Sequence, residues 1–297
     1  MVLQPVAIAR RGELGSAARP RSRGILRRLR RHPSGVVGGM ALAVVVVLVV
    51  LAHIVAPYDP LAVDPISAYQ PPSLAHLLGT DDLGRDLWSR ILYGGRISLL
   101  LGLIAVAIGG TAGTVLGLLA GYFRGLADAA IMLLNDILLT LPGFLLAIGI
   151  VAVLGTGIFH VMIAVGISLI PSFARVVRGS TLSAREADYV LAERVIGVSD
   201  GRIVFRHVLP NVLAPAIVLG TVGVAGAILT GAGLSFIGLG AQPPTAEWGL
   251  MVNEGRASLR TAWWISAFPG VAIMIVVIAI NLIGDAFRDV LDPRLRQ

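Results

Sequence analysis

The sequence predicts an all-α membrane protein with six transmembrane helices. Hydrophobic residues make up 56% of its 297 residues, and charged residues make up only 14%. A soluble protein of this size would need far more polar surface to cover its core. Six apolar segments alternate with polar ones. Each is long enough to cross the hydrocarbon core of a bilayer, about 30 Å, as a helix.

The first apolar segment, residues 35–56, follows a basic tail, residues 1–34, in which nine Arg accompany a single acid. A cleavable signal peptide has an apolar region of about 7–15 residues. The longer run here indicates a permanent first span, which forms one unit with the proline-rich polar segment that extends to residue 96. The other five helices are expected within residues 97–286, followed by a polar tail, residues 287–297. Those helices are expected at residues 97–122, 128–154, 155–173, 212–239 and 261–284.

The distribution of Arg predicts the orientation in the membrane. With six spans both termini lie on one side, and the segments on that side contain 19 of the 24 Arg. Cytoplasmic loops carry an excess of positive charge, so we expect both termini in the cytoplasm. The net charge of +7 then reflects membrane orientation, and nucleic acid is not an expected partner.

Composition also restricts the chemistry of the chain. All its basic residues are Arg, so it lacks the Lys with which a P-loop reaches the phosphates of ATP. It has no Cys, and its five His are scattered without metal-ligand spacing. The acidic loop at residues 79–86 lacks the spacing of an EF-hand. We therefore expect no catalytic site, no metal and no cofactor in this chain.

A polar island, residues 185–211, stands out between the apolar segments. A helix over residues 183–196 would place Ala187, Val190, Leu191 and Val195 on one face. Gly197 then stands where a left-handed helix cap is expected. A second short helix would lead through Pro210 into the fifth span. The island is thus predicted to be a cytoplasmic helix–turn–helix joined to a transmembrane helix.

Two interpretations of the island remain open from its composition. An amphipathic helix can lie on the lipid surface, where a strongly basic face is usual. It can also dock onto a separate ATP-hydrolysing protein. The island interleaves acids with Arg, which suits a protein groove better than a lipid surface.

The island resembles the EAA loop of bacterial ABC importer permeases, E-A-A-x3-G-x9-I-x-L-P. The chain matches at Ala192, Gly197 and Leu209-Pro210, whereas Leu191, Glu193 and His207 depart from the pattern. In that family the loop forms a coupling helix that sits in a groove of the nucleotide-binding subunit. The resemblance implies that loop 181–211 contacts an ATPase, with Glu193 or Arg194 supplying the polar contact. The implied contact residues are Leu191, Ala192, Glu193, Arg194, Gly197, Leu209 and Pro210.

The resemblance extends to one branch of that family. Residues 76–102, 233–256 and 281–296 are similar to the C-type permease of dipeptide and oligopeptide importers. This implies the type I ABC importer permease fold in the cell membrane. The implied partners are a B-type permease, two ATPase subunits that use ATP and Mg, and an extracytoplasmic solute-binding protein. Members of the same branch also carry nickel or glutathione, so the sequence leaves the substrate open.

Three further residues are candidates for the transport pathway. Asp136 lies within the third apolar segment, where an unpaired carboxylate costs about 2.5–3.5 kcal/mol. We therefore expect it to face the bundle interior, with a partner, either as a helix-to-helix contact or near a gate. Glu247 and Trp248 follow a stiff Pro243-Pro244 loop. They are expected to contact the binding protein or gate the outer mouth, or Trp248 anchors the chain at the lipid interface.

Small residues form one face of the second apolar segment. Gly109, Gly110, Gly113, Gly117 and Gly121 recur there at helical spacing. Such a face lets two helices approach closely in lipid. The approach is expected within one bundle, with a seam against a partner subunit as the alternative.

Two other classes of function are alternatives to a permease. An intramembrane enzyme would need a catalytic motif such as H-E-x-x-H or G-x-S-x-G, and neither is present. A self-sufficient channel needs no rigid amphipathic segment in the cytoplasm. Both alternatives are less well supported than a permease driven by a separate ATPase.

Overall fold

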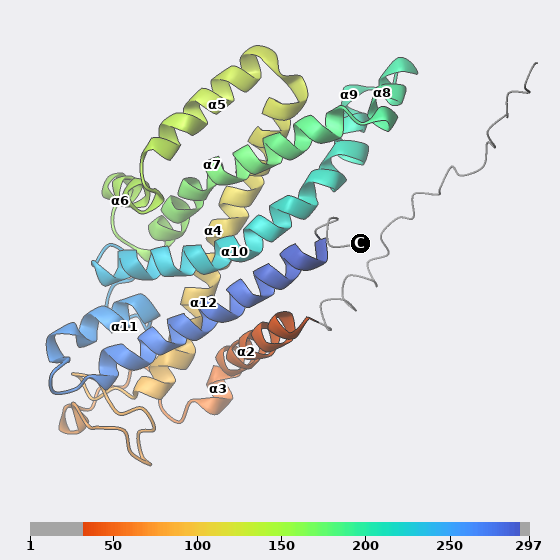
Figure 1. Cartoon of the computed structure of the whole chain (residues 1–297). Helices are drawn as coiled ribbons and strands as arrows, with labels where there is room; N and C mark the ends of the chain where they lie inside the picture. The colour runs from red at the N-terminus through yellow and green to blue at the C-terminus, as the bar shows by residue number, and fades with distance from the viewer. Residues whose placement is uncertain (1–31, 292–297) are drawn as a thin grey trace, which may run out of the picture.

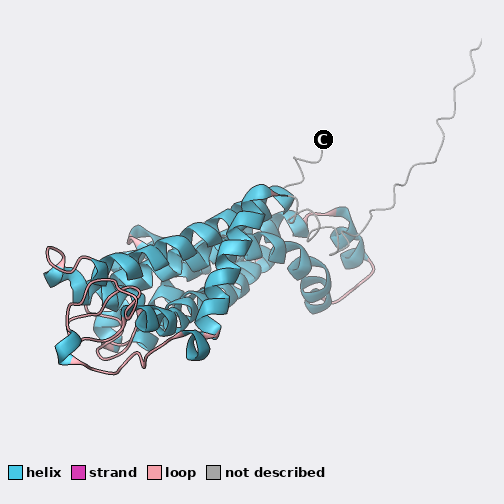
Figure 2. Ribbon diagram, turned by 90° about the horizontal axis from the view of Figure 1, so that it is seen from below, coloured by secondary structure: helices cyan, strands magenta, loops and turns pink. Residues whose placement is uncertain are grey.

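The computed structural model describes residues 32–291, and within this range every regular element is a helix (Figure 1). The predicted tails, residues 1–34 and 287–297, fall largely outside these residues. The longer helices run roughly side by side in an elongated bundle (Figure 2). They are α2 (Pro33–Val50), α4 (Leu87–Phe123), α5 (Gly125–Thr140), α7 (Ile158–Arg185), α10 (Leu209–Phe236) and α12 (Trp264–Leu291), whereas α6 (Gly143–Leu154) lies at 95° to α5.

Five stretches are long and apolar enough to cross a membrane, and the pair α5–α6 brings the number to six if it is one broken span. The fold class predicted from the sequence is confirmed. The third span is not the single helix that was expected, because α5 and α6 meet at 95°. The break falls at Leu141-Pro142, where Leu141 is extended. Proline disfavours a helical residue before it and cannot donate the next helical hydrogen bond.

Two other helices are longer than the sequence indicated. Asp86 caps α4 by accepting a hydrogen bond from Ser89 N at 2.8 Å, so α4 begins well before residue 97. Helix α7 continues past residue 173 to Arg185. The 37 residues of α4 span about 55 Å at 1.5 Å per residue, so α4 extends beyond an about 30 Å hydrocarbon core.

The start of the first span and the end of the last lie together. His32 Nε2 is 3.1 Å from Asp289 Oδ2, so both ends of the described chain are at one end of the bundle. The short helices α8 (Asp188–Val195) and α9 (Asp200–Ile203) are at that same end (Figure 1, Figure 2). The polar segment before α4 and helix α11 (Trp248–Glu254) are at the opposite end (Figure 1). This is the arrangement that an even number of spans requires.

The glycine face of α4 packs against α7 of the same chain. A Cβ on Gly113 would lie 2.4 Å from Phe173 Cβ, and a Cβ on Gly117 would lie 2.6 Å from Ala174 O. Gly109 and Gly121 meet α7 just as closely. The glycines therefore allow close packing within the bundle, as expected, and their contacts with α7 leave no room for a partner helix there.

Candidate functional site

Helix α8 forms the tip of the bundle and ends at the predicted glycine. Gly197 has φ +79°, the left-handed conformation that glycine adopts without strain. Gly197 N donates to Arg194 O at 3.1 Å and Val198 N donates to Glu193 O at 3.0 Å. These two bonds form a Schellman cap. The turn between α8 and α9 is therefore sharp and well defined, as the position of Gly197 in the sequence predicted.

One side of α8 is anchored to the transmembrane helices. Val190 is fully buried in an apolar cluster with Tyr122, Val177 and Val208, which come from three different segments of the chain. The guanidinium of Arg194 lies 5.0 Å from the centre of the Tyr122 ring. Tyr122 therefore links α8 to the last turn of α4, a contact that the sequence gave no reason to expect.

The same tyrosine also contacts the two segments on either side of α8. Tyr122 OH donates to Asp200 Oδ1 at 2.5 Å, and Arg185 Nη1 donates to Tyr122 O at 2.6 Å. Asp200 opens α9 and Arg185 ends α7. The Tyr122 joint, as we call Tyr122 with Arg185, Arg194 and Asp200, holds the ends of four helices together.

Two of the three departures from the EAA pattern contact each other. Glu193 Oε1 lies 2.9 Å from His207 Nε2, and both side chains are about three-quarters buried. His207 belongs to a π-helical turn, Val204–Val208, that leads directly into α10. This polar contact therefore joins α8 to the start of α10. Glu193 and Arg194 both turn toward their own chain, which differs from the expectation that one of them supplies the outward polar contact.

The outward side of α8 is apolar. Leu191 is 46% exposed, Val195 86% and Ile196 76%. The predicted apolar face is split, because successive residues of an α-helix are about 100° apart and Val190 lies well away from Leu191 and Val195 around the axis. Val190 consequently points inward while Leu191 and Val195 point outward. Three large apolar side chains on the surface of a polar island mark a contact site.

Asp136 has the partner that was expected but is not in the interior of the bundle. Its Oδ1 accepts a hydrogen bond from Arg175 Nη2 on α7 at 2.6 Å. Asp136 is 61% exposed and Arg175 60% exposed. The neighbouring Asn135 is buried instead, and its Nδ2 donates to Pro171 O at 2.9 Å. The expectation of an interior position is therefore wrong by one residue along α5.

A second ion pair joins the same two helices. Arg178 donates from Nε and Nη2 to the two carboxylate oxygens of Asp128, at 2.5 and 2.7 Å. The sequence interpretation counted Arg175 and Arg178 among the cytoplasmic Arg because it ended the fourth span at residue 173. Two Arg at i and i+3, with no glycine or proline between Phe173 and Arg178, were the available signal that the helix continues.

Glu247 and Trp248 are buried, which contradicts a direct contact with a binding protein or with lipid. Each is only 1% exposed. The Glu247 carboxylate caps α11 by accepting hydrogen bonds from Gly249 N at 3.0 Å and Leu250 N at 2.9 Å. Trp248 Nε1 donates to Ile91 O at 2.9 Å. Both residues therefore fix α11 against α4, because a capping carboxylate and an indole are most useful where water is excluded.

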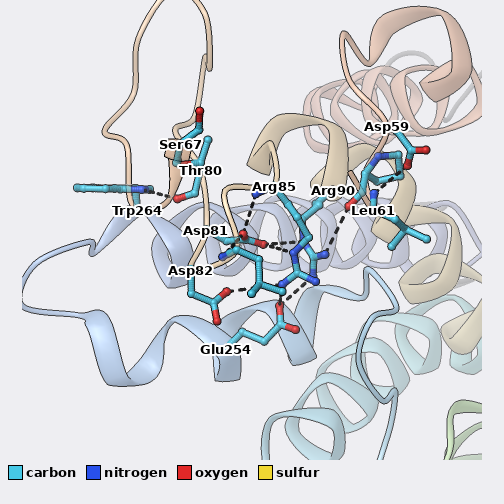
Figure 3. A network of polar contacts seen from close by, with 12 residues as sticks. Asp59, Leu61, Ser67, Thr80, Asp81, Asp82, Arg85, Arg90, Glu254 and Trp264 are labelled. Atoms are coloured by element: carbon cyan, nitrogen blue, oxygen red, sulfur yellow. Dashed lines mark hydrogen bonds and ion pairs between the residues drawn. The ribbon is translucent and has the colours of Figure 1, made fainter. Parts of the chain in front are cut away.

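A buried charge network at the same end was not predicted (Figure 3). Arg90 is fully buried, and its Nη2 donates to Glu254 Oε2 at 2.8 Å. Arg85 Nε donates to Asp81 at 2.6 Å and its Nη2 lies 3.5 Å from Glu254. Burial raises the pKa of Glu254 above its ordinary value, although Arg90 and Arg85 pull it down. The network ties the polar segment to α4 and α11, and its acids are engaged by protein donors.

Comparison with known proteins agrees with this architecture. The family described as binding-protein-dependent transport system inner membrane component matches residues 113–297. The family described as N-terminal TM domain of oligopeptide transport permease C matches residues 21–72. A solved structure of the MetNI methionine ABC transporter, in an inward-facing conformation, is similar with a TM-score of 0.56 at 18% identity. The structural alignment covers 69% of this chain and 98% of the MetNI chain. At this sequence identity the similarity is evidence for a shared fold alone.

Curated relatives cover almost the whole chain. A Brucella abortus biovar 1 (strain 9-941) protein with the provisional name of peptide transport system permease protein is 48% identical over 270 residues. The alignment covers 91% of each protein. Glutathione transport system permease protein GsiD of Escherichia coli O6:K15:H31 (strain 536 / UPEC) is 46% identical over 271 residues, which cover 91% of this chain and 89% of that protein. The chain therefore belongs to the binding-protein-dependent transport system inner membrane components and is a multi-pass permease subunit of an ABC importer.

Proposed function

We propose that this permease carries small peptides into the cytoplasm and that α8 is the element through which a separate ATPase drives it. The role of α8 is supported by the difference between its two sides. Its inner side is fixed by Val190, Glu193 and Arg194, and its outer side exposes Leu191, Val195 and Ile196. An anchored helix with an uncovered apolar face is suited to receive force from a partner and pass it on.

The position of α8 favours a protein partner over the lipid surface. Residues Asp200–Phe236 form one helical stretch of 37 residues, about 55 Å at 1.5 Å per residue. This is far longer than an about 30 Å hydrocarbon core, and α8 contacts its first residues. The helix is also short, at eight residues, and its exposed face carries no basic stripe of the kind that binds anionic lipid.

Peptide substrates are supported by the relatives. The Brucella abortus protein is named for peptide transport and the Escherichia coli protein for glutathione, which is itself a small peptide. Short peptides and glutathione share free carboxylate and ammonium groups, so one pathway of suitable charge can serve both. We propose either as the cargo, delivered by an extracytoplasmic binding protein.

The complete importer would contain this chain, a second B-type permease and two ATPase subunits that bind ATP and Mg. The ATPases must be separate chains because this one has no Lys for a P-loop. The orientation that follows from the Arg distribution places α8 in the cytoplasm, where ATP is available. The opposite end, with α11 and the charge network, then faces the binding protein.

Reconstitution tests the proposal directly. The purified complex is placed in proteoliposomes, and uptake of radiolabelled alanyl-alanine and of glutathione is measured with its binding protein. We expect ATPase subunits to co-purify and uptake to require ATP. Transport by the isolated chain without ATP, or failure of both peptides to accumulate, contradicts the proposal.

A further inference from the structure

The two ion pairs between α5 and α7 differ in a way that indicates different roles. Asp128 and Arg178 make two contacts, and their side chains are 16% and 33% exposed. Asp136 and Arg175 make a single contact at 2.6 Å, and both are about 60% exposed. The first pair is closed and holds the helices together. The second leaves most of its carboxylate and guanidinium available to another molecule.

The open pair lies well inside α7 and not at its tip. Arg175 precedes the end of the helix by ten residues, about 15 Å at 1.5 Å per residue. A charged pair that reaches the hydrocarbon region is costly against lipid, and a pair outside that region is solvated. The exposed side of the pair must therefore face water or another protein chain.

The helix face around Arg175 is polar and has free space. Ser172, Arg175, Gly179 and Ser183 are all exposed and follow one another at intervals of three and four residues. They therefore share one face of α7. A Cβ added to Gly179 would meet no atom within 4 Å. Small polar residues beside an open ion pair leave room for a polar ligand.

We propose that Asp136 and Arg175 form a contact site for the two charged ends of the peptide as it passes through the membrane. This inference rests on the peptide import proposed above. A guanidinium binds a carboxylate through parallel N–H groups, and a carboxylate accepts hydrogen bonds from an ammonium. A zwitterionic peptide offers one group of each kind. It can replace both partners of the ion pair at once, so that the charges at the site stay balanced.

The weakness of the open pair suits this exchange. An exposed ion pair contributes about 0–1 kcal/mol, so opening it costs little. A pathway also needs contacts that are favourable enough for entry and weak enough for release. A closed pair such as Asp128–Arg178 meets neither need, because parting a pair held by two hydrogen bonds costs more.

The test compares the two pairs in the complete, reconstituted importer. Arg175→Gln and Asp136→Asn remove one charge each from the open pair, and Arg178→Gln is the matched change in the closed pair. The measured quantity is alanyl-alanine uptake per ATP hydrolysed by assembled complex. We expect a loss of about tenfold for the two open-pair variants. Arg178→Gln should lower the melting temperature or the yield of the complex but keep uptake per assembled complex within about twofold.

A charge exchange, Asp136→Arg with Arg175→Asp, separates recognition from a purely structural role. It restores an ion pair but reverses the charges that a peptide delivered in one orientation meets. We expect the exchanged importer to assemble and to transport poorly. Recovery of uptake to the wild-type level, wild-type uptake by Arg175→Gln, or loss of assembly in all these variants contradicts the inference. Absence of peptide uptake by the wild-type complex instead contradicts the proposed function.

Discussion

His207 Nε2 lies 2.9 Å from Glu193 Oε1, and this contact joins the middle of α8 to the turn that leads into α10. Both residues stand where the EAA pattern has apolar side chains, Ala and Ile. The two departures are therefore one substitution in physical terms, since a polar contact takes the place of an apolar contact. A displacement of α8 can pass through this pair to α10 and through the Tyr122 joint to α4.

The contact between Glu193 and His207 predicts that the effect of replacing one residue depends strongly on the identity of the other. Glu193→Ala or His207→Ile alone leaves one polar group without its partner at a site about three-quarters buried, which costs about 1–3 kcal/mol. The double variant restores the apolar pair of the family pattern. We expect each single variant to lower peptide uptake per ATP hydrolysed and the double variant to recover most of it. Additive losses in the double variant contradict a direct coupling between the two residues.

The packing of α4 on α7 predicts that Gly113 tolerates no side chain. Gly113→Ala places a Cβ within 2.7 Å of the carbonyl oxygen of Ile170, so the helices must separate, at about 1–3 kcal/mol. Gly226 in α10 has nothing within 4 Å of an added Cβ. Gly226→Ala should therefore be neutral or stabilising. Thermal unfolding in detergent checks both, and equal melting temperatures for the two variants contradict the packing described.

The burial of Trp248 predicts that replacing it lowers the stability of the protein and leaves recognition of the binding protein unchanged. Trp248→Phe removes the hydrogen bond to Ile91 O in a buried site, at about 1 kcal/mol. Trp263 is 54% exposed at the same end of the bundle, and Trp263→Phe is the matched control. We expect a lower melting temperature for the Trp248 variant only, with unchanged affinity of the assembled complex for its binding protein. If the Trp248 variant keeps its full stability but changes its affinity for the binding protein, Trp248 contacts that protein directly, which contradicts its role as a buried packing residue.

The sequence was informative where the relevant physics is local. The apolar segments followed from length and hydropathy, and the end of α8 followed from Gly197, whose φ of +79° is available without strain to glycine. The glycine face of α4 was also visible from its helical period. In each case the deciding residues are neighbours along the chain.

The rest depended on contacts between distant segments. Glu247 became a buried cap because Ser98, 149 residues away, donates to it at 3.1 Å. Arg175 and Arg178 are compatible with a membrane helix because α5 brings Asp136 and Asp128 beside them. The break at Pro142 was a partial exception, because a proline within a span is a local signal for a kink. Its 95° angle depends on the packing of α6 against α7.

The buried network predicts an acid-dependent stability. Burial raises the pKa of Glu254 above its ordinary value, so the folded state holds this proton over a pH range in which the unfolded state has released it. The window is the pH range between the ordinary pKa of Glu254 and its raised value. The contribution of Glu254 to the free energy of unfolding is fully present below this window and falls as pH rises through it. Above the window the dependence ends.

Replacing this carboxylate should remove that dependence. Glu254→Gln resembles the protonated carboxyl, so we expect the variant to differ little in stability from the wild type at pH values below the window. The melting temperature of the variant relative to that of the wild type should rise as pH rises through the window. Melting curves across mildly acidic to neutral pH check this, and a constant difference contradicts the direction of the pKa shift.

The most direct test of the account is the association of the ATPase subunits with a complex altered on the outer face of α8. Val195→Arg places a charge on a side chain that is 86% exposed, so the fold of this chain should persist. Leu74→Arg is the matched change at the opposite end, where Leu74 is 100% exposed. We predict that Val195→Arg lowers co-purification of the ATPase subunits about tenfold or more and that Leu74→Arg leaves it unchanged. Full ATPase association and full peptide uptake in the Val195 variant would show that α8 is not the site through which the importer is driven.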